Sequence, residues 1–200
     1  MTERFVFLGF KQFIGKHCET SALKRVLDQH ELSLSEEMLL GLGGGVGFIY
    51  WYMKSMPSPF IGGRYGKGTD FPSNICQRIG ADVTISETSS LTKGYEELKA
   101  ILRSGEPAVV YGDMAYLPYL AIPEVAHFGG HAFVVFGLDE DRDEAYIYDR
   151  GKNPVIVTLT DLEKARGSKS PPFPPKHRLL KIEYPSQINN LGACPSNSFR

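Results

Sequence analysis

Residues 129–150 read GGHAFVVFGLDEDRDEAYIYDR, and this stretch decides the fold. It contains two apolar runs, Ala132–Gly137 and Ala145–Tyr148, which are typical of buried strands. The charged segment Asp139–Glu144 between them is typical of a turn. The stretch therefore predicts an antiparallel pair of strands joined by a hairpin turn.

One polar residue stands at each end of this hairpin. His131 enters the first strand directly after two glycines, and Asp149 follows the second strand. Because the turn lies near the middle of the segment between them, hairpin pairing brings the two side chains together at one end. A carboxylate there can accept a hydrogen bond from the imidazole and fix its tautomer and orientation.

The rest of the second half is also interpreted mainly as sheet. A short helix is predicted over 160–166 with Thr160 as its N-cap, and Pro171–Pro175 is interpreted as an extended linker or surface arm. Strand-like apolar runs continue the sheet at 108–111, 155–157 and 179–182.

The first half is predicted to be mainly helical. Apolar residues at helical spacing cover 18–30, and a second helix through 36–40 would be capped by Ser33 or Ser35 and end at the glycines from Gly41. Helical spacing returns at 71–79 and 95–102, strand-like patterns cover 1–10, 48–52 and 81–86, and prolines break the chain into a loop at 57–64.

Helices followed by antiparallel strands describe an α+β protein. We expect one domain over residues 1–185, with a helical half at about 12–105, a sheet half at about 106–185 and a polar tail at 186–200. A chain of 200 residues buries enough surface for a substantial core.

Composition narrows the classes of function. Lys plus Arg (22) nearly balances Asp plus Glu (23), so the chain lacks the basic surplus of a nucleic-acid-binding protein. No apolar run is long enough to span a membrane. The three cysteines, Cys18, Cys76 and Cys194, are too widely spaced for a zinc motif and odd in number. We therefore expect no cofactor or metal. We also expect a reducing cytoplasmic location, where a functional cysteine would act through its reactivity rather than through a disulfide.

Cys18 would open the first predicted helix, where the positive end of the helix dipole favours thiolate over thiol. His131 could then act as its base and Asp149 as the carboxylate that orients the base. Gln12 lies six residues before Cys18, so its amide could fold back and bind a developing oxyanion together with the Cys18 backbone N–H.

Each of these residues also has an ordinary interpretation. A lone cysteine is usually a small buried hydrophobe, a strand histidine is usually structural, and an aspartate after a strand is usually a turn residue. Their order along the chain favours the catalytic interpretation. Gln12, Cys18, Gly130-His131 and Asp149 in this order resemble the papain-like superfamily, especially its bacteriocin-processing branch, in which Asp is the third member.

A closer resemblance is to the family of the N-terminal domain of butirosin biosynthesis protein H. It implies a papain-like cysteine protease fold, with N-terminal helices packed on a C-terminal antiparallel sheet, and it spans roughly residues 12–185. The segments that carry it are His17–Leu23, Leu34–Gly45, Gly63-Arg64, Asp113–Tyr119, Gly129–His131, Leu162–Arg166 and Pro172–Pro175.

The resemblance also implies an activity. The namesake of that family moves an aminoacyl group from a carrier-protein thioester to an amine, so we expect an acyl-carrier protein or small thioester as donor and an amine as acceptor. Two alternatives remain open: a cysteine peptidase or amide hydrolase on the same triad, and a catalytically inactive binding domain. A homo-oligomer is possible, whereas nucleic-acid and membrane partners are not expected.

Four further residues are candidates for substrate binding. Asp113 could hold a substrate amine and Arg64 a substrate carboxylate, although solvation of surface charges is the simpler interpretation. Tyr116 could wall the pocket, and Gly130 stands directly before His131.

Three other features point to structure rather than chemistry. The glycine run 41–47 lacks both the Lys-Ser/Thr and the third glycine of nucleotide loops, so it is interpreted as close backbone packing. His127 and His131 are four residues apart, but the glycines between them disfavour a helix and no third metal ligand is evident. His17 is interpreted as a loop or cap residue.

Overall fold

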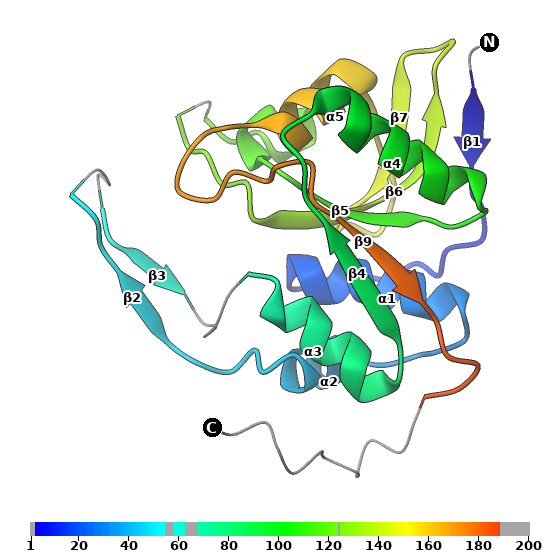
Figure 1. Cartoon of the computed structure of the whole chain (residues 1–200), viewed down its shortest axis with the longest axis horizontal. Helices are drawn as coiled ribbons and strands as arrows, with labels where there is room; N and C mark the ends of the chain where they lie inside the picture. Colours follow the sequence, from blue (N-terminus) through cyan, green and yellow to red (C-terminus); the bar gives the residue numbers. More distant parts are fainter. Residues whose placement is uncertain (1–2, 55–57, 63–67, 124, 189–200) are drawn as a thin grey trace.

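An antiparallel seven-stranded sheet forms the centre of the molecule in the computed structural model, which describes residues 3–54, 58–62, 68–123 and 125–188. The strand order is β4-β9-β5-β6-β7-β8, and β1 pairs with the far part of β6 (Figure 1). The strands of this sheet are β1 (Arg4–Val6), β4 (Asp82–Ser86), β5 (Ala108–Gly112), β6 (His131–Asp139), β7 (Glu144–Tyr148), β8 (Val155–Thr158) and β9 (Leu179–Glu183).

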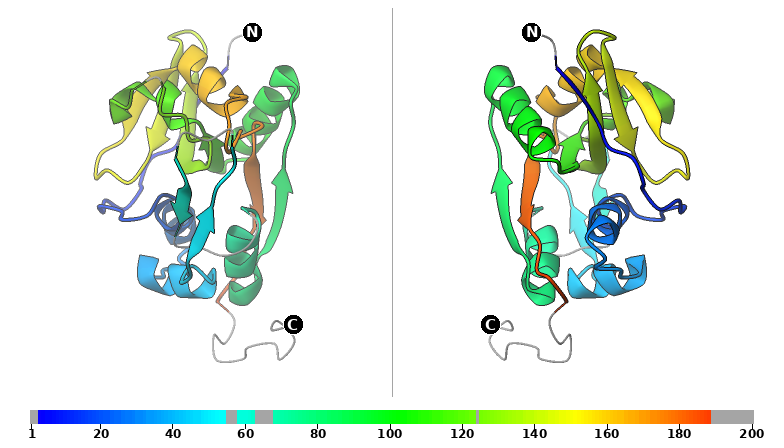
Figure 2. Two further views of the ribbon diagram at one scale, coloured as in Figure 1. Left: turned by 90° about the vertical axis from the view of Figure 1, so that its left-hand side faces the viewer. Right: turned by 90° about the vertical axis from the view of Figure 1, so that its right-hand side faces the viewer.

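Helices cover both faces of the sheet (Figures 1 and 2). On one face lie α1 (Cys18–Gln29), α2 (Glu36–Leu42) and α3 (Asp70–Ile79), and on the other lie α4 (Leu91–Arg103) and α5 (Leu159–Gly167). Two short 3-10 turns, η1 (Met114–Tyr116) and η2 (Pro118–Leu120), follow β5, and a separate hairpin of β2 (Ile49–Trp51) and β3 (Phe60–Gly62) projects beside the sheet.

The central strand β6 packs against two hydrophobic cores, one on each face of the sheet. All nine of its residues are buried, and successive side chains point to opposite faces. Ala132, Val134 and Phe136 join the core beneath α1–α3, whereas Phe133 and Val135 join the core beneath α4 and α5. A strand that is apolar on both faces needs a packed layer on each of them, and here helices form both layers.

The predicted hairpin is present as β6 and β7. Val134 pairs with Tyr148, and a bulge between Val135 and Gly137 shifts the register by one residue. Extending the pairing by one residue places Asp149 opposite Phe133, on the same face as His131 two residues away. The two polar residues are therefore diagonal neighbours, a separation that long side chains can span.

The α+β prediction is confirmed, and most predicted elements are present within two residues of their expected limits. The sheet, however, is not confined to the second half of the chain. The first half contributes β1, which pairs with β6, and β4, which pairs with β9 at the sheet edge. Sequence patterns predicted both strands but not their long-range partners.

Two local predictions were wrong. The loop expected from Pro57 onward contains β3, whose three residues are held by pairing with β2 rather than by their own propensity. The N-cap of α5 is Thr158 instead of Thr160, because Thr158 has extended backbone angles and its hydroxyl accepts from Asp161 N at 2.9 Å.

The interpretation of Pro171–Pro175 as a linker or surface arm was also wrong. Pro175 is buried, and the Phe173 ring packs against the rings of Trp51, Phe60 and Phe128. The segment fits so closely against Gly129 that a Cβ there would lie 2.1 Å from the Phe173 carbonyl oxygen. The proline-rich segment is thus part of the folded body.

Candidate active site

Cys18 is half-buried at the first position of α1, and within the described residues its sulfur forms no disulfide. The preceding residue, His17, is the N-cap: its Nδ1 accepts from Thr20 N at 3.4 Å, as the cap interpretation required. A carboxylate from α2, Glu36, fixes the same turn. It accepts from Lys16 N at 2.9 Å, and the hydroxyls of Thr20 and Ser21 donate to it at 2.8 and 2.7 Å. The start of α1 is therefore rigidly held.

His131 lies between Cys18 and Asp149. Its ring is 2% exposed, and Nε2 donates to Asp149 Oδ2 at 2.8 Å, which leaves Nδ1 for the hydrogen bond to Cys18. Burial alone would lower the pKa of His131, but the hydrogen bonds to Asp149 and Cys18 and the charges of both residues raise it to about 9. The site therefore favours an imidazolium, the form that pairs with a thiolate.

The carboxylate of Asp149 is itself held in place. Oδ1 accepts from Arg150 N at 2.7 Å, and the Tyr119 hydroxyl donates to Oδ2 at 3.2 Å. Burial tends to raise the pKa of Asp149, but the hydrogen bond and the charge of His131 outweigh it and keep the pKa below its usual value. Asp149 is thus ionised and aimed at the imidazole.

Arg25 contacts the backbone on both sides of the site, and sequence patterns did not predict this role. Its guanidinium is buried between the rings of Phe13 and Tyr148, at 4.2 and 4.4 Å from their centroids. It donates to the carbonyl oxygens of Asp149 at 3.2 Å and Gly151 at 2.7 Å, and also to carbonyls of the segment before Cys18. One buried cation therefore positions the backbone on both sides of the triad.

The segment before Cys18 contacts the end of β7 directly. Gly15 N donates to Arg150 O at 2.7 Å, and a Cβ at Gly15 would lie 1.9 Å from Ser21 Oγ, so only glycine fits there. The Gln12 side chain is exposed and forms no hydrogen bond within the part of the chain that the structure describes. The structure thus brings Cys18, His131 and Asp149 together, while an oxyanion role of Gln12 stays a prediction.

Asp113 lies inside the protein rather than at its surface. Its side chain is fully buried, Oδ1 accepts from the backbone N–H groups of Ala115 and Phe128, and Oδ2 contacts His127 Nδ1 at 2.8 Å and Ser168 Oγ at 2.6 Å. This carboxylate ties together the loop between β5 and β6 and the end of α5. The interpretation of Asp113 as a solvated surface charge was wrong, and a substrate amine could reach it only by displacing these partners.

The other candidate binding residues have different surroundings. Tyr116 is 36% exposed and its ring lies 5.5 Å from that of His127, away from the triad. Gly130 lines a pocket of about 590 Å³ together with His17, and these two residues directly precede His131 and Cys18 in the chain. Arg64 lies outside the described residues.

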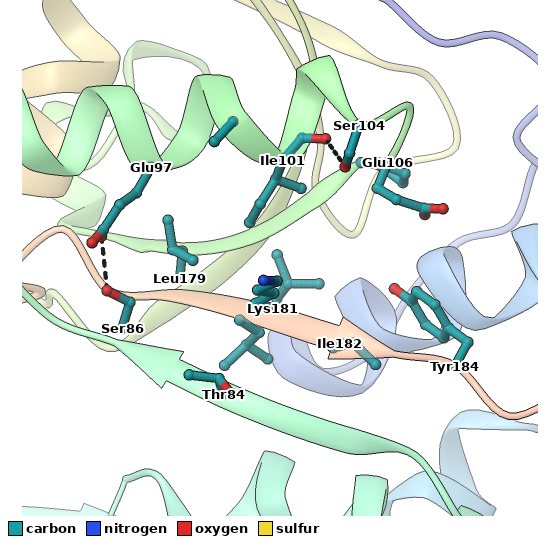
Figure 3. Close-up of a pocket in the computed structure, with 14 residues that line it drawn as sticks. Thr84, Ser86, Glu97, Ile101, Ser104, Glu106, Leu179, Lys181, Ile182 and Tyr184 are labelled. Carbon is teal, nitrogen blue, oxygen red and sulfur yellow. Dashed lines mark hydrogen bonds between the residues drawn. The ribbon is translucent and has the colours of Figure 1, made fainter.

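A second pocket, of about 460 Å³, lies between α4 and the strands β4 and β9 (Figure 3). The Ser86 hydroxyl donates to Glu97 at 2.7 Å across its mouth. None of its lining residues belongs to the triad or neighbours it in sequence, whereas His17 and Gly130 of the pocket of about 590 Å³ directly precede Cys18 and His131.

Across residues 3–54, 58–62, 68–123 and 125–188, no three His, Cys, Asp or Glu side chains are grouped to hold a metal ion. The helices of the same ranges include none with the length and apolar character that a membrane span requires.

A cysteine at a helix start, a strand histidine and an aspartate that orients it, on helices packed against an antiparallel sheet, define a papain-like cysteine enzyme. Comparison with solved structures supports this fold. A protein from Bacillus anthracis described as a C39-like peptidase superposes with a TM-score of 0.60 and 17% identity over 92% of this chain and 100% of its own. At that identity the likeness concerns the fold.

The family follows from the sequence match. Residues 17–150 match the family described as butirosin biosynthesis protein H, N-terminal, and the chain belongs to that family. The matched region begins beside Cys18 and ends just after Asp149, so it contains the whole triad. No curated protein matches the chain significantly.

Proposed function

We propose that the protein is an acyltransferase that moves an acyl group from a thioester to an amine through an acyl-enzyme on Cys18. The observation that carries the proposal is the hydrogen-bonded chain Cys18–His131–Asp149, in which the pKa of His131 is raised to about 9. Membership of a biosynthetic family favours transfer over proteolysis. A carrier-protein or small thioester is the proposed donor.

In the first step the Cys18 thiolate attacks the thioester carbonyl carbon, and a new carbon–sulfur bond forms. The bond to the donor sulfur breaks, and the leaving thiolate takes the proton of the His131 imidazolium. Thioester exchange is nearly isoenergetic, so the task of the site is to supply a thiolate and bind the oxyanion. The Cys18 N–H at the start of α1 and the Gln12 amide are the proposed oxyanion donors.

In the second step the amine attacks the acyl-enzyme, and His131 takes a proton from the nitrogen as the Cys18–acyl bond breaks. Acylation prepares His131 for this task. Two of the interactions that raise its pKa, the hydrogen bond and the charge of Cys18, disappear when the sulfur is acylated. The pKa of His131 then falls, and the neutral imidazole becomes available as a base.

A hydrolase on the same triad is the second candidate, because the similar fold from Bacillus anthracis is described as a peptidase. In that case water replaces the amine in the second step. A reducing, cytoplasmic setting suits either reaction, since it keeps the sulfur of Cys18 reduced.

The test is intact-mass spectrometry after incubation with a panel of acyl thioesters, with Cys18→Ser and His131→Ala alongside. We expect an acyl adduct that maps to Cys18 in the wild type, is absent in Cys18→Ser, and disappears with amide formation when an amine is added. Loss of the adduct to water at the same rate with or without amine would identify a hydrolase. No adduct with any thioester, together with an unreactive Cys18, would indicate a binding domain.

A further inference from the structure

The pocket beside Gly130 has one wall made by the hairpin β2–β3. Strand residues alternate between two faces, and here the alternation separates pocket from solvent. Trp51 and Phe60 are cross-strand partners, and both line the pocket. The intervening residues Tyr50 and Ile61 point the other way and are 61% and 62% exposed. The hairpin therefore presents its aromatic face to the pocket.

The opposite wall is built around Phe173. Its ring centroid lies 5.1 Å from that of Phe60, 5.6 Å from Phe128 and 5.9 Å from Trp51, in tilted or edge-to-face geometries that aromatic rings prefer. The close contact of the Phe173 main chain with Gly129 fixes this ring relative to β6. Four aromatic side chains from three separate segments thus converge on one cavity.

The lining of this cavity includes the residue directly before each member of the catalytic pair. His17 and Gly130 both line it, and they are the immediate sequence neighbours of Cys18 and His131. A Cβ at Gly130 would lie 3.0 Å from the Phe128 ring, so a side chain there would press on the aromatic wall. The cavity wall thus lies within one residue, along the chain, of the sulfur that would carry the acyl group.

Charges at the rim do not turn the cavity into an anion site. Lys176 and Arg178 are the cations of its lining, and both pair with Glu87, at 3.8 and 2.6 Å. Both cations are thus engaged by one carboxylate, and the aromatic rings are the largest apolar surfaces that the lining offers a ligand.

We propose that this pocket binds the acyl group of the substrate and selects acyl groups that end in an aromatic ring. The proposal rests on the proposed function, since it concerns the acyl-enzyme of that reaction. A cavity of about 590 Å³ holds an arylacyl group with space to spare, and stacking plus apolar burial supply the selectivity. Small polar acyl groups gain neither.

The first experiment measures Cys18 acylation by phenylacetyl and acetyl thioesters of N-acetylcysteamine, each rate normalised to its reaction with glutathione. We expect phenylacetyl to be favoured by about 10- to 100-fold. Phe173→Ala and Trp51→Ala should each reduce this preference by about tenfold or more. Tyr50→Ala and Ile61→Ala are matched controls on the outward face of the same hairpin and should keep the wild-type preference.

A second probe works even if no thioester reacts. Cys18 is alkylated with iodoacetamide or with its N-phenyl analogue, and the ratio of the two rates is again compared with glutathione. The pocket predicts a ratio at least about tenfold higher for Cys18, lowered by Phe173→Ala or Trp51→Ala. If this preference holds while every thioester fails, the proposed transfer is wrong but the aromatic pocket stands. Equal ratios for Cys18 and glutathione, unchanged in both variants, would overturn the pocket proposal.

Discussion

Cys18 and Cys76 both lie on helices that pack against the same core. Their surroundings differ in burial, in position on the helix and in hydrogen-bond partner, which together control the reactivity of a thiol. Cys18 is half-buried at the first residue of α1 and hydrogen-bonds to His131. Cys76 is 1% exposed in the interior of α3, and burial raises its pKa to about 12.

The difference shows that reactivity here comes from position and partners, since the two residues are chemically the same. A helix start offers free N–H groups and a positive dipole end, and His131 supplies a proton acceptor that burial alone would have made weaker. Cys76 has burial without either partner, so it acts as a small apolar side chain of the core.

The largest expected effect is in alkylation. With a pKa of about 12, only about one Cys76 thiol in 10⁵ is ionised at pH 7, whereas the hydrogen bond of Cys18 to His131 favours a thiolate. We expect iodoacetamide to modify Cys18 more than about 1,000-fold faster than Cys76, as measured by peptide-mapped mass spectrometry at pH 7.

Cys76→Ala is the matched control and should leave the alkylation rate of Cys18 unchanged. Modification of Cys18 and Cys76 at comparable rates in the folded protein would contradict the claim that their surroundings set their reactivity. It would also contradict the proposal that Cys18 is the nucleophile.

The next effect concerns pH and Asp149→Asn. The pKa of His131 is raised to about 9, so the imidazolium persists at neutral pH and is lost as the pH rises through about 9. Acylation, which needs that proton for the leaving thiolate, should therefore decline above about pH 9. Asparagine keeps a hydrogen-bond acceptor but removes the charge, so the pKa of His131 should fall and the alkaline limb should move to lower pH.

At pH 7 we expect Asp149→Asn to slow acylation by about 10- to 100-fold, measured with one thioester across pH 5 to 10. An alkaline limb that stays in place in Asp149→Asn would show that Asp149 does not set the pKa of His131.

For the free energy of unfolding, we expect the opposite order: substitution of Cys76 should have the larger effect and substitution of Cys18 the smaller. Cys76→Ser buries a hydroxyl in an apolar core and should lower the free energy of unfolding by about 1–3 kcal/mol. Cys18→Ser changes a half-buried helix-start residue and should cost less than about 1 kcal/mol. Urea unfolding of both variants measures this, and equal losses would contradict the contrast between a structural and a reactive thiol.

The smallest expected effect is that of Tyr119→Phe. This change removes the hydrogen bond to Asp149 Oδ2 at 3.2 Å but leaves the ring in place. Asp149 keeps its hydrogen bonds to His131 and to Arg150 N, so we expect the loss of this long hydrogen bond to slow acylation by only about 2- to 10-fold. An effect as large as that of Asp149→Asn would mean that Tyr119 does more than orient the carboxylate.

Local sequence patterns predicted the helices and strands of this fold well. The spacing of apolar residues and the glycines, prolines and caps that end an element are all properties of neighbouring residues. The hairpin 131–149, the helix that begins at Cys18 and the cap His17 all follow from short stretches of sequence. The convergence of Cys18, His131 and Asp149 was predicted from their order together with the family resemblance.

Features that depend on distant partners could not be predicted in this way. Arg25 sits at helical spacing like any surface cation, yet it is buried between two rings and binds carbonyls far along the chain. Asp113 and Phe173 lie in segments without periodicity, and only the tertiary structure shows that one is an internal tie and the other the centre of an aromatic wall.

The contacts of Arg25 have a consequence for the order in which activity arises during folding. α1 carries the nucleophile near the beginning of the chain, and the backbone that Arg25 clamps lies after β7, so the site closes only when these distant segments dock. Ordering such long-range contacts carries a large loop-closure cost, so the geometry of the site exists only in the folded chain. Before these segments dock, Cys18 lacks His131 as a partner and is an ordinary thiol.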